Sequence, residues 1–309
     1  MTAWLVLLVP ALLLPIVLLF AFVGCSGEQF VATEPTTPQP QDPSPQPQDP
    51  RLTPPRPTGP PSARAPYGDV ITRTLTLAAY WPLSERAGAT ARDLGPLGLP
   101  GTYTGGVQLG ILGSGALVLR DPDDTAPHFD GTSAWVEVLF NGQLNRDATF
   151  PFSFEAWVKP EGDPFAWKAE QAVVSSHELV GNREHGFELS VVHTSGTQPA
   201  IRGRVFTGLA NPAYHDLSHP LPTAPDTWRF LVLTYDGAGT LTLYIDSVDQ
   251  TATGVSFQPN AGQSLRIGAD RQPGADPTAY FAGHIAQVAL YQSALSQQDV
   301  NNHFAAARP

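Results

Sequence analysis

Short apolar runs separated by Gly, Pro, Asn and Asp fill the sequence beyond Ile71. In residues 152–159, Phe, Phe, Ala and Val alternate with Ser, Glu, Trp and Lys. This period of two is typical of a strand with one face on a core. Residues 230–235 are nearly all apolar, as in a central strand, and residues 236–239 provide a turn before the strand predicted at 241–245. The pattern predicts an all-β, antiparallel β-sandwich.

The chain is predicted to end in a short helix. Ser296 and Asp299 have the spacing of a capping box, with Asp in place of the usual Glu. Val300 and Phe304 follow at a separation of four residues, so they share one helix face.

Five segments in order resemble laminin-G-like domains of the concanavalin A type, which bacteria display outside the cell. They are YWPL at 80–83, FDG at 129–131, FSFEAWVKP at 152–160, WRFLVLTYDGAGTLTLYID at 228–246 and YFAGHIAQVALYQSALS at 280–296. The resemblance covers roughly residues 70–305 and implies a jelly-roll β-sandwich. It does not imply one activity, because lectins, adhesion modules, hydrolases and structural spacers share this scaffold.

The N-terminus predicts membrane attachment. Residues 3–23 contain no charge and are long enough to span a bilayer. Cys25, the single cysteine, follows directly after Gly24, and this sequence resembles a bacterial lipobox in which the thiol is acylated. An uncleaved helix and simple secretion are the alternatives, because the position three before Cys25 is Phe22 and the first residues lack Lys and Arg. Each alternative places the rest of the chain outside the cytoplasm.

A proline-rich linker separates this segment from the domain. Thirteen of the 32 residues from 35 to 66 are proline, and PQPQDP occurs twice. Such sequence favours extended polyproline II. We therefore predict a signal or transmembrane segment at 1–25, a disordered linker at 26–67 and a laminin-G-like jelly-roll domain at 68–309.

Charge and cysteine content exclude some classes. The formal net charge is −11, and no basic cluster provides an electrostatic footprint for nucleic acid. With a single cysteine, the domain has no internal disulfide.

The domain is predicted not to be an enzyme. The E-x-D-x-x-E triplet of concanavalin-type glucanases, the H-E-x-x-H motif and the G-x-S-x-G elbow are all absent. We expect Glu155 to be an ordinary outward-facing carboxylate. One polar cluster remains to be explained, and its members are His177, Glu178, Glu184, His185 and Glu188. We interpret them as polar residues that flank a hairpin turn at Gly181 and Asn182, in preference to a metal or catalytic site.

A structural Ca²⁺ is the cofactor that the resemblance suggests. Carboxylate oxygens for such an ion are available on Asp121, Asp123, Asp124 and Asp130. One observation argues against a Ca²⁺ site. The family's I-D-E-V motif is replaced by Ile285, Ala286, Gln287 and Val288, so two acids are missing.

Aromatic side chains in loops are the candidates for ligand contacts. A loop Trp or Tyr stacks on the apolar face of a sugar while polar neighbours bind its hydroxyls. The candidates are Trp167, Trp135, Tyr214 and His215, whereas we expect Trp81, Trp157 and Trp228 to pack in the core. The sequence therefore predicts a non-catalytic, membrane-tethered binding module for carbohydrate recognition or adhesion. The alternative is a structural or protein-interaction domain of the cell envelope.

Overall fold

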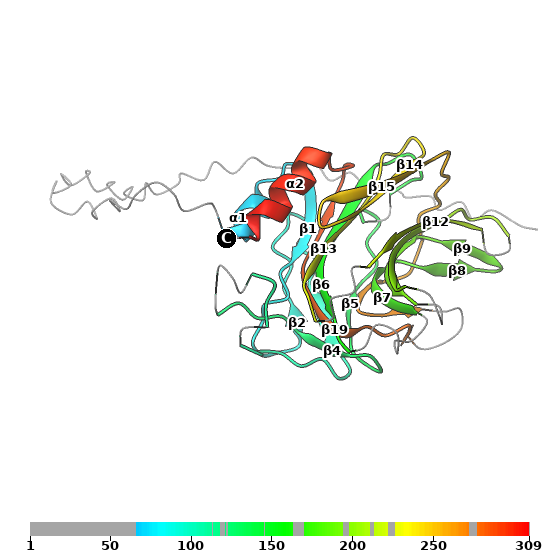
Figure 1. Cartoon of the computed structure of the whole chain (residues 1–309). Helices are drawn as coiled ribbons and strands as arrows, with labels where there is room; N and C mark the ends of the chain where they lie inside the picture. The colour runs from blue at the N-terminus through cyan, green and yellow to red at the C-terminus, as the bar shows by residue number, and fades with distance from the viewer. Residues whose placement is uncertain are drawn as a thin grey trace, which may run out of the picture. The chain divides into compact units, whose positions relative to one another are not determined.

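The domain is a sandwich of two antiparallel β-sheets (Figure 1). The computed structural model describes residues 66–112, 114–117, 121, 123–144, 146–162, 170–193, 198–210, 213–221, 226–271 and 277–308. The chain divides into two units, residues 1–59 and 60–309, and every described residue belongs to the second. No helix among the described residues is long and apolar enough to cross a membrane. The anchor, Cys25 and most of the linker lie outside them, so these predictions stay untested.

A seven-stranded sheet forms one layer. Its strand order is β1 (Leu77–Trp81), β19 (Ala282–Tyr291), β6 (Phe152–Pro160), β13 (Arg229–Tyr235), β14 (Thr240–Ile245) and β15 (Val248–Thr253), with β4 (His128–Asp130) also paired to β19. The hairpin predicted at residues 236–239 joins β13 to β14, and β13 lies in the interior of the sheet as expected.

An eight-stranded sheet forms the second layer. Its order is β12 (Tyr214–Pro220), β11 (Ala200–Phe206), β10 (Phe187–Val192), β7 (Glu170–Ser175), β16 (Leu265–Ile267), β5 (Trp135–Val138), β3 (Gly101–Thr104) and β2 (Thr90–Ala91). Two small ribbons pair β8 (Glu178–Val180) with β9 (Arg183–His185) and β17 (Asp270–Arg271) with β18 (Pro277–Thr278). The predicted jelly-roll sandwich is confirmed.

The main core lies between the two sheets. Phe154, Ala156 and Val158 of β6 point into it, as their alternation predicted. Residues of the other sheet meet them there, including Leu189, Val136 and Ile267. Trp81 is fully buried in this core.

Two helices cover the opposite face of the seven-stranded sheet (Figure 1). They are α1 (Tyr67–Thr72) and α2 (Gln297–Ala306), and the predicted capping box at Ser296 and Asp299 is formed. Phe304 of α2 stacks on Trp157, with ring centroids 5.9 Å apart. A second apolar cluster therefore lies outside the sandwich, and Trp157 belongs to it rather than to the main core. Trp228 is half-buried at its border.

Glu155 contradicts our expectation of an outward-facing carboxylate, because it is 0 % exposed beneath these helices. The phenol of Tyr67 donates to its Oε1 at 3.0 Å, and Nδ1 of His303 lies 2.7 Å from its Oε2. Strand alternation correctly placed Glu155 on the outer face of β6, but two helices distant in sequence cover that face. A buried carboxylate needs a partner and hydrogen bonds, and both helices supply them.

The Glu155–His303 pair also makes stability depend on pH. Burial by itself lowers the pKa of His303, but the Glu155 carboxylate outweighs burial and raises the pKa above its ordinary value. A raised pKa means that this contribution is complete below about pH 6.5 and is lost as the pH rises through the folded-state value.

We predict that Glu155→Gln lowers the free energy of unfolding by about 3 kcal/mol at pH 6, because it leaves His303 without its counter-ion. Urea denaturation at pH 6 and pH 9 measures the difference from the wild type, which should shrink at the higher pH. The control is Glu137→Gln, which removes a carboxylate 3.8 Å from Arg266 at a partly exposed site and should cost under about 1 kcal/mol. Equal losses in the two variants would contradict the role given to the buried pair.

Candidate functional site

The outer face of the eight-stranded sheet is the face turned away from the seven-stranded sheet. Val136, Val138, Ile201 and Val205 point inward to the main core. Side chains alternate along a strand, so the residues between them point outward. These outward residues are mainly polar or aromatic, so the outer face is chemically distinct from the core.

One row of outward side chains crosses six strands in register. Its members from β12 to β5 are Asp216, Arg204, Glu188, Ser175, Arg266 and Glu137. Cross-strand partners on one face lie close enough to interact. Arg204 binds Asp216 through two hydrogen bonds of 2.6 and 2.7 Å. The charges of the row largely compensate one another.

Next to this row, two carboxyl groups contact one guanidinium. Nη2 of Arg202 binds both Glu170 and Glu188, and the two carboxyl groups also hydrogen-bond each other. Burial and the neighbouring carboxylates raise the pKa of Glu188 well above its ordinary value. Partial burial opposes ionisation of Glu170, but the hydrogen bond from Glu188 and the charge of Arg202 lower its pKa overall. The two carboxyl groups are therefore inequivalent, and Glu188 holds its proton to higher pH than Glu170 does.

Tyr214 lies on the same face at the edge strand β12. It is 41 % exposed, and the Arg204 guanidinium lies 3.7 Å from the centroid of its ring. Phe206 of β11 meets it edge to face, and Arg204 is itself held by Asp216. These contacts hold an accessible aromatic ring beside polar groups. His215 points the other way, with Nε2 3.2 Å from the backbone nitrogen of Ser256.

Trp135 also belongs to the outer face, on β5. It is half-buried against Tyr280, with ring centroids 6.0 Å apart. Its indole Nε1 is buried and makes no hydrogen bond to any described residue. Two of the aromatic residues proposed from sequence, Trp135 and Tyr214, thus share one face on strands far apart in the sheet. Trp167 lies outside the described residues.

The predicted hairpin at Gly181 and Asn182 is present, between β8 and β9. Its polar neighbours His177 and Glu178 are buried, which we did not expect of residues beside a turn. His177 stacks on Phe206, with ring centroids 4.2 Å apart. His177 also lies 3.2 Å from Asp270 through Nδ1 and 3.5 Å from Glu184 through Nε2. His185 lies 4.0 Å from Glu178, whose Oε2 accepts from the backbone of Ala261 at 2.6 Å. The cluster forms a buried polar network beside the outer face.

The four aspartates proposed for Ca²⁺ do not converge on one point. Asp130 accepts from three backbone N–H groups and from Ser133 Oγ at 2.6 Å, all within its own loop. Slight burial opposes its ionisation, but these hydrogen bonds hold the pKa of Asp130 well below its usual range. Its loop is tight, because a Cβ at Gly106 would lie 2.3 Å from Asp130 Oδ2. In the part of the chain that the structure describes, no group of three or more acidic, His or Cys residues is placed to hold a metal.

Asp121, Asp123 and Asp124 form a separate local turn. The backbone of Asp123 donates to Asp121 Oδ1, and Asp124 Oδ2 accepts from the backbone of Leu117. These contacts account for the crowding of acids that the sequence shows, and the residues present do not fit a Ca²⁺ site.

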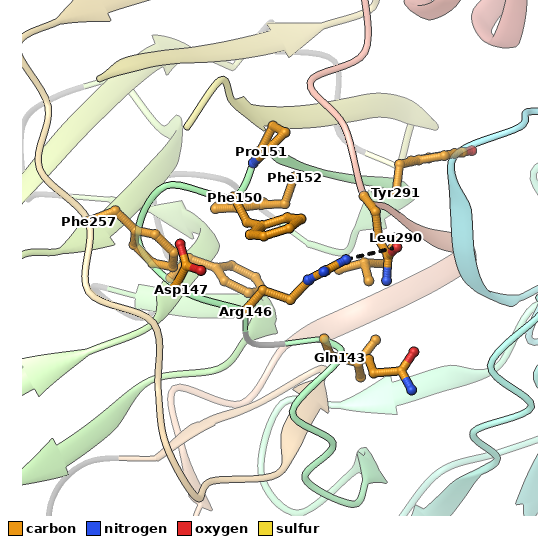
Figure 2. Close-up of a pocket in the computed structure, with 12 residues that line it drawn as sticks. Gln143, Arg146, Asp147, Phe150, Pro151, Phe152, Phe257, Leu290 and Tyr291 are labelled. Atoms are coloured by element: carbon orange, nitrogen blue, oxygen red, sulfur yellow. Dashed lines mark hydrogen bonds between the residues drawn. The ribbon is translucent and has the colours of Figure 1, made fainter. Parts of the chain in front are cut away.

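A small pocket at one end of the sandwich is lined by aromatic side chains (Figure 2). Phe152 contacts Phe187 and Phe257, with centroids 5.5 and 5.2 Å apart. Arg146 lies 3.5 Å from the ring centroid of Phe150 and donates to Gln292 at 3.4 Å. The pocket encloses about 20 Å³, room for about one water molecule. It is a closed end of the core rather than a ligand site.

Comparison with known proteins identifies the family. The family model described as "Concanavalin A-like lectin/glucanases superfamily" matches residues 130–301. The chain belongs to this family. A search of curated proteins found no match.

Solved structures resemble this concanavalin A-like domain in fold. The receptor binding domain of botulinum neurotoxin D has 15 % identity and a TM-score of 0.55, over 74 % of this chain and 52 % of that one. A structure of botulinum neurotoxin type C, whose title reports interaction with two ganglioside molecules, has 13 % identity and a TM-score of 0.54, over 76 % of this chain and 52 % of that one. The chain thus spans about half of these neurotoxin domains.

A third structure is matched over nearly its whole length. It is domain 4 of AbnA, a GH43 extracellular arabinanase from Geobacillus stearothermophilus, in complex with arabinotriose. It has 19 % identity and a TM-score of 0.52, over 74 % of this chain and 98 % of that one. At these identities the likeness shows the fold alone.

Sequence reasoning missed Arg202, Arg204 and Asp216 as members of the site. A signal for them existed, because the segment AIRGRVF at 200–206 alternates arginine with apolar residues. The alternation indicates that both arginines share a face, but not which strand lies beside them. Their partners Glu170 and Glu188 are set by the strand register, which cannot be deduced from the sequence alone.

The opposite pKa shifts of Glu170 and Glu188 lead to a test with two matched variants. Because the pKa of Glu188 is raised, its contribution to stability is complete below about pH 4.3 and is lost as the pH rises through the folded-state value. Glu188→Gln imitates the protonated carboxyl, so at pH 8 we expect it to be at least as stable as the wild type.

Glu170→Gln, the matched control, removes the charge facing Arg202 and should cost about 1 kcal/mol. Thermal unfolding between pH 5 and pH 8 measures both variants. A larger loss for Glu188→Gln than for Glu170→Gln at pH 8 would contradict a raised pKa of Glu188 and a lowered pKa of Glu170.

Proposed function

We propose that this chain is a non-catalytic glycan-binding module, and that the sugar binds at the β12 edge of the outer face. The observation that carries the proposal is the exposed ring of Tyr214, held by Arg204 and flanked by polar groups. Aromatic rings stack on the C–H faces of sugars, and neighbouring polar side chains fix the sugar's orientation. Asp216 and Ser218 point to the same face as Tyr214 along β12 and supply such groups.

The comparisons support a binding role without naming the ligand. Among proteins of this fold, one structure holds arabinotriose and another carries a title that reports ganglioside interaction. Arabinotriose is an oligosaccharide and a ganglioside is a lipid that carries one, so the fold is compatible with sugar recognition on an extracellular protein.

The carboxyl pair favours binding over glycoside hydrolysis. A hydrolase holds two carboxyl groups about 5–10 Å apart on opposite sides of the scissile bond. Here Glu170 and Glu188 contact each other and share Arg202, and Glu188 is 1 % exposed. A pair in this arrangement leaves no space for a sugar between its carboxyl groups.

A glycan array with the full-length protein tests the proposal. Reproducible binding to one sugar class is expected, and Tyr214→Ala should weaken it about ten-fold by removing the stacking surface. The control is Phe140→Ala. Phe140 is 38 % exposed but follows β5, which four strands separate from β12 in the sheet order. A silent array from folded protein, or equal effects of both variants, would argue instead for the protein-interaction function.

We further infer that the module is tethered outside the cytoplasm through acylated Cys25. The support is the uncharged segment 3–23 followed by Gly24 and Cys25. Cys25→Ser should move the protein from the membrane to the soluble fraction or block its maturation, as measured by fractionation and by the mass of the mature N-terminus. If the Cys25→Ser protein stays in the membrane fraction, and both it and the wild type keep the uncleaved N-terminus, the segment is a transmembrane helix instead.

A further inference from the structure

A second, larger pocket lies between the two helices, on the opposite side of the molecule from the outer face. It has a volume of about 540 Å³, within the range of roughly 300–1,000 Å³ usual for small-molecule sites. It lies where the end of α1 and the segment before β1 meet the segment after β19 and the inner side of α2. Its main polar side chains are Thr74, Thr76, Ser293, Asn302 and His303.

Three side chains of the lining carry hydroxyl groups: Thr74, Thr76 and Ser293. Thr74 Oγ1 lies 3.1 Å from Nε2 of His303 and 3.2 Å from the carbonyl of Val70. Thr76 Oγ1 lies 2.7 Å from Ser293 Oγ. Each hydroxyl has one donor and two acceptor positions, so these contacts leave hydrogen-bonding capacity for a ligand.

The charged groups at the pocket are already paired. Arg73 lies 3.6 Å from Asp69, and Asp299 belongs to the capping box of α2. His303 is paired with buried Glu155, and Arg73 and Asp299 have opposite signs. The pocket therefore has no excess charge that would select an ionic ligand.

Apolar side chains complete the pocket wall. Val70 and Leu295 line it, and the side chain of Leu75 at its rim is fully exposed. An exposed apolar surface next to several hydroxyls complements a molecule that has both C–H faces and hydroxyl groups.

We propose that this pocket binds an uncharged mono- or oligosaccharide, as a second sugar site independent of Tyr214. This proposal rests on the proposed function, because it takes the domain to be a glycan-binding module. Sugar hydroxyls hydrogen-bond to Thr74, Ser293 and Asn302, and the C–H face of the ring contacts Leu75.

Helix α2 offers a matched pair of variants for the test. Asn301 and Asn302 are both exposed, and each accepts a hydrogen bond from the glutamine four residues earlier, at 3.0 and 2.9 Å. Asn302 lines the pocket, whereas Asn301 is not among its lining residues. Asn302→Trp places a bulky indole at the pocket, and Asn301→Trp makes the same change at the adjacent position, outside the lining.

Saturation-transfer NMR and calorimetry with the full-length protein provide the measurement. The probes are arabinotriose and cellotriose, with 3′-sialyllactose as the charged comparison. In the Tyr214→Ala background, which removes the other proposed site, we expect an uncharged probe still to bind, Asn302→Trp to abolish this remaining binding and Asn301→Trp to leave it unchanged. Asn302→Ala should weaken binding about five-fold, as expected for the loss of one hydrogen bond.

Three results would overturn the pocket assignment: no binding of either uncharged probe, equal effects of the two tryptophan variants, or a preference for sialyllactose. The Tyr214 site is judged separately. If Tyr214→Ala abolishes all binding and Asn302→Trp has no effect, the glycan-binding function stands and the second site fails. If neither the array nor the probes show binding, both fail.

Discussion

The buried pair of Glu155 and His303 is the interaction on which the outer layer of the domain depends. Glu155 lies in the middle of β6, and its carboxylate is removed from water only because α1 and α2 cover it. Tyr67 from α1 and His303 from α2 provide its hydrogen bonds, so each helix satisfies a group that the other helps to bury. A buried carboxylate without partners would be costly, and the pair therefore makes the positions of both helices specific.

The two sheets differ in what lies on their outer faces. The seven-stranded sheet is covered on both sides, by the main core and by the helices. Glu155 on its outer face hydrogen-bonds to the two helices and so holds them against the sheet. The eight-stranded sheet has its core side filled in the same way, but its outer face carries compensating charges, the exposed ring of Tyr214 and the half-buried ring of Trp135. A polar surface organised by strand register is suited to sugars, because it combines ordered hydrogen-bonding groups with rings held in place. The pocket between the helices is a second polar surface, in which hydroxyl and amide groups lie beside aliphatic side chains rather than aromatic rings.

Much of the fold and part of the site follow from sequence patterns. Alternation in β6, the apolar run of β13 and the capping box at Ser296 are local signals, and each produced the expected element. Tyr214 and Trp135 were proposed because aromatic residues outside a core pattern are unusual, and their role in ligand binding stays a prediction. Glu155 was misjudged since alternation gives the direction of a side chain but not what covers it. Arg202 and Arg204 were missed since their importance comes from Glu170, Glu188 and Asp216, which lie on other strands.

The sequence by itself determined the class of fold, the family and the separation of an apolar N-terminus, a proline-rich segment and a β-rich domain. These properties depend on residue type and on spacing within a few positions, which a chain carries in any conformation. Only the tertiary structure decided which polar residues are buried, which charges compensate one another and which residues of α1 and α2 line a pocket. Those properties depend on pairings between segments as far apart as Glu155 and His303, because burial and electrostatic interaction are set by distance in space and not by distance along the chain.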